Sequence, residues 1–200
     1  MTPTGRDQVL GRVREALKQR AKLEHPGRLT VDRSQPPVDS FRDRFTQNGG
    51  EVAGPEADPR EWLVRLLSGL SSEQGSTTST IAPGAHVPAS WIQGLPVAGP
   101  EVASVGVSMA WGAAGDSGSV LLESTGGRRV QLLPPVHVVF VPESRVRPTL
   151  GEALEAAHPA LPATLGVHSG PSKSADIGST LVKGVHGPGR IIAVLVPAPS

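Results

Sequence analysis

The sequence of 200 residues contains no cysteine and no tyrosine, and aromatic side chains make up only 3% of it. Without cysteine the chain can form no disulfide, and it can offer no thiolate to zinc or to an iron–sulfur cluster. If the protein works in a redox pathway, the electrons must therefore pass through another subunit. The scarcity of aromatic rings also argues against the binding of nucleic acids by base stacking.

The sequence also lacks a strong charge of one sign and any long apolar run. Its net charge of +1 gives little support to the binding of nucleic acids or other polyanions. No apolar run approaches the roughly 20 residues that span a bilayer. The N-terminal segment MTPTGRDQVLGRVREALKQR is charged throughout and lacks the apolar stretch of a signal peptide. We therefore expect a cytoplasmic protein that does not contact a membrane.

Residues 1–37 are predicted to form a helical arm and an extended linker. Thr4 and Asp7 have the spacing of a capping box, and apolar residues then recur at helical intervals. The polar segment Glu24–Pro37 carries three prolines, which is typical of a linker. Residues 38–200 are long enough to form a single domain with its own core.

In this domain, predicted helices alternate with predicted strands. Helices are predicted over Val38–Gln47, from Asp58 onward, over Leu150–Ala157 and over Ser174–Lys183. Strands are predicted over Ser76–Ala82, Val102–Ala113, Ser119–Glu123, Val136–Val141, Thr164–His168 and Arg190–Val196. This order predicts an α/β fold, a three-layer sandwich in which a mainly parallel central sheet is covered on both sides.

The segment SGPSKSADI, residues 169–177, follows a predicted strand and opens a predicted helix. Gly170 begins a tight turn, Ser172 and Ser174 can cap the helix, and Lys173 adds a positive charge. A helix N-terminus presents free N–H groups and the positive end of the helix dipole, so this segment suits a phosphate or a carboxylate. The alternative is ordinary N-capping beside a solvated lysine.

The loop GVHGPG, residues 184–189, follows the same predicted helix. Its glycines, Gly187 among them, let a ligand or another backbone approach closely. His186, in the middle of the loop, can donate a hydrogen bond to an anion or exchange a proton near neutral pH. The alternative is that His186 only caps a neighbouring carbonyl.

Asp116 lies in the glycine-rich turn GAAGDSGS, residues 112–119, between predicted strands. A carboxylate in this position could act as a base, a nucleophile or a ligand for a hydroxyl group. The alternative is a plain turn aspartate. No pair of histidines has the spacing of metal ligands, so the sequence predicts no metal site.

Five motifs follow one another in an order that is characteristic of a known family. They are AGDSGS (114–119), GRR (127–129), LLPPVHVVFV (132–141), GPSKSADI (170–177) and GVHGP (184–188). In this order they resemble the LUD (lactate utilisation) domain family, from Ala113 to the end of the chain. Asp116 stands where the family usually has glutamate, and Ser117 where it usually has threonine. The shorter carboxylate has less reach, which weakens the case for a catalytic acid at Asp116.

The resemblance implies a fold similar to the NagB/RpiA/CoA-transferase superfamily. It also implies a role in a system that oxidises L-lactate to pyruvate, beside iron–sulfur and Cys-rich partner proteins. Iron–sulfur clusters would then be confined to those partners, and this chain would carry no cofactor.

Three functions remain open at this point, the last of them a scaffold with a vestigial cleft. In the first, the chain is an accessory component of lactate oxidation that binds a small anionic ligand between the two turns. The ligand-binding residues would be Gly170, Ser172, Lys173, Ser174, His186 and Gly187. In the second, the chain is a stand-alone enzyme or transferase that acts on a phosphorylated or CoA-linked small molecule, with Asp116 as the catalytic residue.

Overall fold

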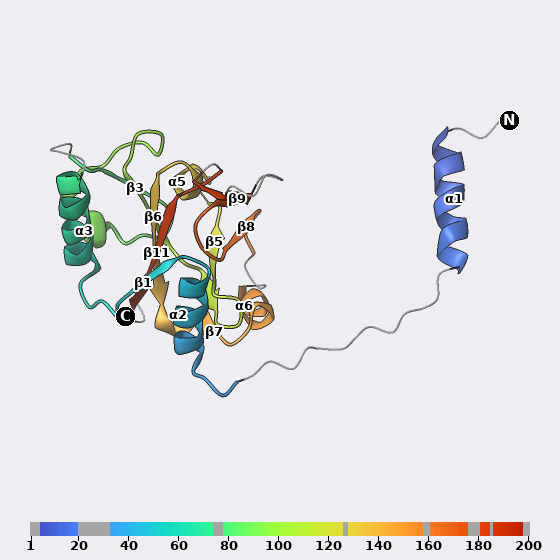
Figure 1. Ribbon diagram of the computed structural model, residues 1–200, viewed down its shortest axis with the longest axis horizontal. Coiled ribbons are helices and arrows are strands. Elements are labelled where there is room, and N and C mark those ends of the chain that lie inside the picture. The colour runs from blue at the N-terminus through green and yellow to red at the C-terminus, as the bar shows by residue number, and fades with distance from the viewer. Residues whose placement is uncertain are drawn as a thin grey trace. The chain divides into compact units, whose positions relative to one another are not determined.

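The computed structural model describes residues 5–19, 33–73, 78–125, 128–157, 161–175, 181–184 and 186–197 (Figure 1). The chain divides into two compact units, Met1–Thr30 and Val31–Ser200. The first unit contains the predicted helix, α1 (Gly5–Gln19), which exposes the apolar side chains of Val9 and Leu17. Most of the predicted linker lies outside the described residues. Within the described part of the chain, no helix is long and apolar enough to cross a membrane.

The second unit is built on a five-stranded parallel sheet. Its strands, in spatial order, are β1 (Glu51–Ala53), β11 (Arg190–Val196), β6 (Val136–Pro142), β3 (Val105–Met109) and β2 (Ile81–Pro83). The runs VHVVFVP and RIIAVLV form the centre of this sheet because an almost continuous apolar run suits a strand buried on both faces. Val138 and Phe140 point to one face of β6, and Val139 and Val141 to the other.

Helices α3 (Pro59–Glu73) and α4 (Ala89–Ile92) cover one face of this central sheet. Asp58 caps α3 as predicted, because its Oδ1 accepts a hydrogen bond from the Glu61 backbone N–H at 2.9 Å. Leu63, Leu67 and Leu70 of α3 are buried against the sheet. In Figure 1, α3 lies to the left of the central sheet.

The other face of the central sheet packs against a second sheet and against α2 (Pro37–Gln47), whose Phe41 and Phe45 are fully buried. The second sheet has the order β7 (Val146–Arg147), β4 (Gly112–Ala114), β5 (Ser119–Glu123) and β8 (Leu165–His168). Helix α6 (Leu150–Ala157) packs on the outer side of this sheet, through Ala153. Two short helices, α5 (Arg129–Leu132) and the 3-10 helix η1 (Glu143–Arg145), flank β6. The predicted α/β three-layer sandwich with a mainly parallel central sheet is confirmed.

The prediction of one strand over Val102–Ala113 is wrong, because this segment forms two strands in different sheets. After β3, the Ala110 N–H donates to the Phe140 carbonyl of the central sheet at 2.8 Å. The next N–H, that of Trp111, donates to the Leu121 carbonyl of the second sheet at 2.8 Å. The chain therefore crosses from one sheet to the other at this point, while the apolar pattern of the sequence continues without a break.

The predicted helix over Ser174–Lys183 is also wrong. Strands β9 (Lys173–Ala175) and β10 (Leu181–Lys183) pair in an antiparallel hairpin, and residues 176–180 lie outside the described part. The segment contains Gly178 and the β-branched Thr180 and Val182, which favour strands and turns over helices. The predicted strand over Ser76–Ala82 begins later than expected, as β2, and residues 74–77 lie outside the description.

Candidate functional site

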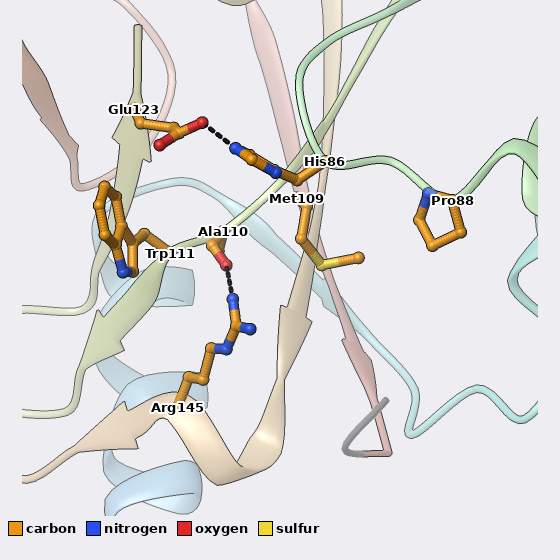
Figure 2. A pocket seen from close by; sticks show the side chains of 7 residues that line it. All are labelled: His86, Pro88, Met109, Ala110, Trp111, Glu123 and Arg145. Carbon is orange, nitrogen blue, oxygen red and sulfur yellow. Dashed lines mark hydrogen bonds and ion pairs between the residues drawn. The ribbon is translucent and has the colours of Figure 1, made fainter. Parts of the chain in front are cut away.

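A hollow of about 290 Å³ lies at the carboxyl ends of three neighbouring strands of the central sheet (Figure 2). His86 follows β2, Met109 ends β3, and Arg145 follows β6 in η1. Glu123, the last residue of β5, enters the hollow from the second sheet. Parallel α/β sheets bind their ligands at the carboxyl edge, where the loops after adjacent strands converge. This hollow is therefore the leading candidate for a binding site.

Figure 2 shows that His86 and Glu123 point toward each other, with Nε2 of the histidine against Oε1 of the carboxylate. The Glu123 side chain is only 12% exposed, whereas that of His86 is 62% exposed. His86 also has a φ of 61°, which is uncommon outside glycine and is often found at functional sites. An imidazole paired with a carboxylate is a proton-exchanging group of the kind used in acid–base chemistry.

Arg145 adds a positive charge to the hollow. Its Nη1 donates to the Ala110 carbonyl at 3.4 Å (Figure 2). Because a guanidinium has five N–H donors, this single contact leaves others for a ligand. The remaining wall is apolar and includes Pro88, Met109 and Trp111. A cation, a proton-exchanging pair and an apolar wall together suit a small organic anion.

The fully buried His137 of β6 and the half-buried His168 of β8 bring their rings together from the two sheets. Burial, and to a lesser degree the neighbouring charge of His168, lowers the pKa of His137 to about 3. Burial first, and Arg128 second, also lowers the pKa of His168. The two rings meet edge to face, with their centroids 6.5 Å apart. His137 is therefore neutral near pH 7, so it brings hydrogen-bonding capacity and no positive charge.

The two turns singled out in the sequence do lie together. The Ser172 N–H donates to the Pro188 carbonyl at 3.0 Å, and the Gly184 N–H donates to the Ser172 carbonyl at 3.0 Å. The His186 N–H lies 3.4 Å from the Ser172 hydroxyl oxygen, to which it donates. The 170s turn and the 180s turn are thus adjacent, although a hairpin and not a helix separates them along the chain.

Two of the predicted ligand-binding residues, Lys173 and Gly170, lie against Asn48. Lys173 donates from Nζ to the Asn48 carbonyl, and Gly170 adopts a φ of 138° beside that same residue. His186 and Gly187 line a separate hollow whose other walls are leucine, proline and glycine. The side chain of Ser174 lies outside the description. An anion site at these turns stays a prediction. The helix N-terminus that suggested it is absent among the described residues, because β9 begins there instead.

Asp116 lies apart from both hollows. Its Oδ1 accepts a hydrogen bond from the Leu150 N–H at 2.9 Å, at the start of α6. Its other surroundings include Ser40 and Arg44 of α2. A catalytic role for Asp116 stays a prediction. In the structure its side chain caps the start of α6. Among the described residues, no three histidine, aspartate or glutamate side chains are arranged to hold a metal ion.

Sequence reasoning missed His86, Glu123 and Arg145. A usable signal was present, because each polar residue stands at or shortly after the end of an apolar strand. What the sequence did not indicate is that β2, β3 and β6 are neighbours. Without that order, three polar residues spread over 60 positions show no common site.

Known proteins resemble this chain over most of its length. Residues 101–196 match the LUD domain family. Lactate utilization protein C of Geobacillus thermodenitrificans is 30% identical over 189 residues, which cover 90% of this chain and 77% of that protein. Lactate utilization protein C 1 of Bacillus mycoides is 38% identical over 104 residues, but this alignment covers only 48% of this chain and 44% of that protein.

A solved structure shows the same fold. It is the crystal structure of a DUF162 family protein from Deinococcus radiodurans, with a TM-score of 0.53 and 22% sequence identity. The match covers 80% of this chain and 96% of that one. At this identity the likeness concerns the fold alone. Taken together with the Geobacillus relative, the matched segment shows that the chain belongs to the LUD domain family.

Proposed function

We propose that this chain acts in lactate utilization as a component without a redox centre, and that it binds a small carboxylate beside His86, Glu123 and Arg145. The names of the relatives support the pathway. The absence of cysteine supports a role without electron transfer. The observation that carries the binding site is the convergence of these three side chains at the carboxyl edge of the central sheet.

The chemistry of the hollow matches a short organic acid. Arg145 would bind the carboxylate, since a guanidinium pairs with carboxylates through two parallel hydrogen bonds. The His86–Glu123 pair would lie near the next carbon of the ligand and could accept or supply a proton there. Met109 and Trp111 would cover the apolar end of the ligand.

Isothermal titration calorimetry of the full chain with L-lactate and pyruvate tests this proposal. We expect Arg145→Gln to weaken binding at least about tenfold, the usual effect of losing a charged hydrogen bond. Arg147→Gln is the matched control, because Arg147 lies two residues further on, is exposed, and does not line the hollow. Equal loss in the two variants, or no loss in either, would remove the hollow as the binding site.

The proposed partners are iron–sulfur and Cys-rich proteins that carry the electrons in the same cytoplasmic system. Affinity purification of the full chain from its native cells, with iron analysis of the co-purified proteins, tests this part. Deletion of the chain should abolish growth on L-lactate and leave growth on pyruvate unchanged. Normal growth on lactate after deletion, with no co-purified iron protein, contradicts the accessory role.

A second candidate function is an enzyme or transferase that acts on a phosphorylated or CoA-linked small molecule. The size of the hollow favours it, because about 290 Å³ is more than a three-carbon acid occupies and approaches the range of larger ligands. A thermal-shift screen with sugar phosphates, CoA esters and 2-hydroxy acids separates the two candidates. Stabilisation by a CoA ester or a sugar phosphate alone, lost in Glu123→Gln or Asp116→Asn, would favour the enzyme.

A further inference from the structure

A small polar recess adjoins the hollow on the side of α5. Its volume of about 10 Å³ is roughly the room for one water molecule. The recess shares Met109 and Glu123 with the hollow, so the two spaces are neighbours. Ser108 of β3, Gln131 of α5 and the more exposed Thr125 contribute its other polar side chains. The recess is large enough to admit one oxygen atom of a ligand that is bound in the hollow.

Gln131 presents a fixed hydrogen-bond acceptor to this recess. The residue is only 5% exposed, and its Nε2 donates to the Glu123 backbone carbonyl at 2.7 Å. That bond identifies which end of the amide is nitrogen and holds the other end, Oε1, in place. Within the described part of the chain, Oε1 accepts no hydrogen bond although it is buried. A buried acceptor of this kind calls for a donor from a ligand or from water.

Ser108 presents a donor to the same recess. Its Oγ lies 2.9 Å from Nε2 of His137, and that ring is fully buried. Nδ1 of His137 has no hydrogen-bond partner among the described residues. A buried N–H without an acceptor is rarer than a lone pair without a donor, which favours the tautomer with hydrogen on Nε2. Ser108 then accepts from His137, and its own O–H is free to donate into the recess.

We propose that the recess binds a ligand hydroxyl, and that Gln131 makes the site select 2-hydroxy acids over the corresponding 2-oxo acids. A hydroxyl oxygen can accept from Ser108 and donate to Oε1 of Gln131 at the same time. A ketone oxygen only accepts, so it leaves the Gln131 oxygen facing another lone pair. Sites built to hydrogen-bond a hydroxyl discriminate strongly against analogues that lack it. This inference rests on the proposed function, because Arg145 must hold the carboxylate.

Calorimetry with L-lactate, pyruvate and propionate tests the selectivity. We expect the wild-type chain to bind L-lactate at least about tenfold more tightly than either of the other acids. Gln131→Met keeps the approximate size of the side chain and removes the amide. The affinity of this variant for L-lactate should therefore fall to its affinity for pyruvate. Gln93→Met is the control, because Gln93 is exposed and does not line the recess. It should leave the preference unchanged.

Ser108→Ala provides a test that does not disturb Gln131, should Gln131→Met fail to fold. We expect this variant to bind both L-lactate and pyruvate more weakly, since both acids would accept a hydrogen bond from the Ser108 hydroxyl. Unchanged affinities in Ser108→Ala, or equal binding of the two acids by the wild-type chain, overturn the inference about the recess. The proposed function survives that result if Arg145→Gln still weakens binding of both acids. Failure of every acid to bind the wild-type chain overturns both.

Discussion

The ammonium group of Lys173 donates a hydrogen bond to the backbone carbonyl of Asn48, the C-cap residue of helix α2. The last carbonyls of a helix carry a partial negative charge, so a lysine in this position is stabilising. The contact joins the β9–β10 hairpin to a helix that lies 125 residues earlier in the chain. It gives Lys173 a structural role, and the anion-binding role suggested by its sequence neighbours stays a prediction.

The substitution Lys173→Met is therefore expected to lower stability and leave ligand binding intact. The free energy of unfolding should fall by about 0.3–1 kcal/mol, the usual worth of a cation at a helix C-terminus. Urea denaturation measures this change, and Lys173→Arg serves as the control that keeps the charge. Loss of lactate binding in a folded Lys173→Met protein would instead place the ligand at the turns around Ser172 and His186.

Asp116 should behave as a helix cap in the same kind of measurement. Its Oδ1 accepts the Leu150 N–H at 2.9 Å, so Asp116→Ala should cost about 1 kcal/mol of stability. Asp116→Asn keeps an oxygen acceptor and should cost less than half of that. If Asp116→Asn proves as stable as the wild-type chain but abolishes turnover of a CoA ester or a sugar phosphate, Asp116 is a catalytic acid.

Stability should fall as the pH is lowered below 6.5. In the folded chain, burial lowers the pKa of His137 to about 3, whereas in the unfolded chain it is near 6.5. Between these values the unfolded state binds a proton that the folded state does not, so acid favours unfolding. The loss is at most roughly 1.4 kcal/mol per pH unit for one histidine. His168, whose pKa burial also lowers, acts in the same direction.

Urea denaturation at pH 7.5, 6.0 and 5.0 tests this dependence. His137→Asn should show a shallower decline than the wild-type chain, because the buried histidine no longer titrates. Gln93→Met, at an exposed position that carries no titratable group, is the control and should leave the slope unchanged. A free energy of unfolding that stays constant from pH 7.5 to 5.0 would contradict the burial of the His137 ring.

Gly106 of β3 should tolerate no side chain. A Cβ at this position would lie 2.2 Å from the Val130 backbone oxygen in α5. Gly106→Ala should therefore cost about 1–3 kcal/mol, and it should displace α5 together with Gln131 of the recess. The control is Gly69→Ala in α3, where a Cβ has nothing within 4 Å. This substitution should raise the free energy of unfolding by up to about 1 kcal/mol, because alanine favours the helix. Equal thermal stability of the two variants would contradict the close approach of α5 to β3.

Elements with a local signal were predicted well. Helix α2 and helix α6 carry their apolar stripes and end signals within their own residues, and the apolar runs of β6 and β11 are long and unbroken. The hairpin of β9 and β10 has the sequence pattern of a helix because its two strands are short, and among the described residues each pairs only with the other. A three-residue strand has too few positions to show an alternating pattern.

The candidate site was predicted only in part, for a related reason. Ser172 and His186 were expected to lie together and do so, because both belong to turns that border one short segment. His86, Glu123 and Arg145 were not expected to meet, because each belongs to a different stretch of the chain. Their meeting depends on the spatial order β6, β3, β2 and on the packing of β5 over that edge.

The sequence by itself determined the α/β class, the buried central strands, the lack of a thiolate site and the likeness to the LUD domain family. These properties depend on composition and on patterns within short segments, where side-chain spacing alone decides which face is apolar. Only the tertiary structure decided that the chain changes sheets at Ala110, that Lys173 faces Asn48 and that Gln131 faces the recess. Each of these depends on contacts between distant segments, which are settled by packing of the whole core.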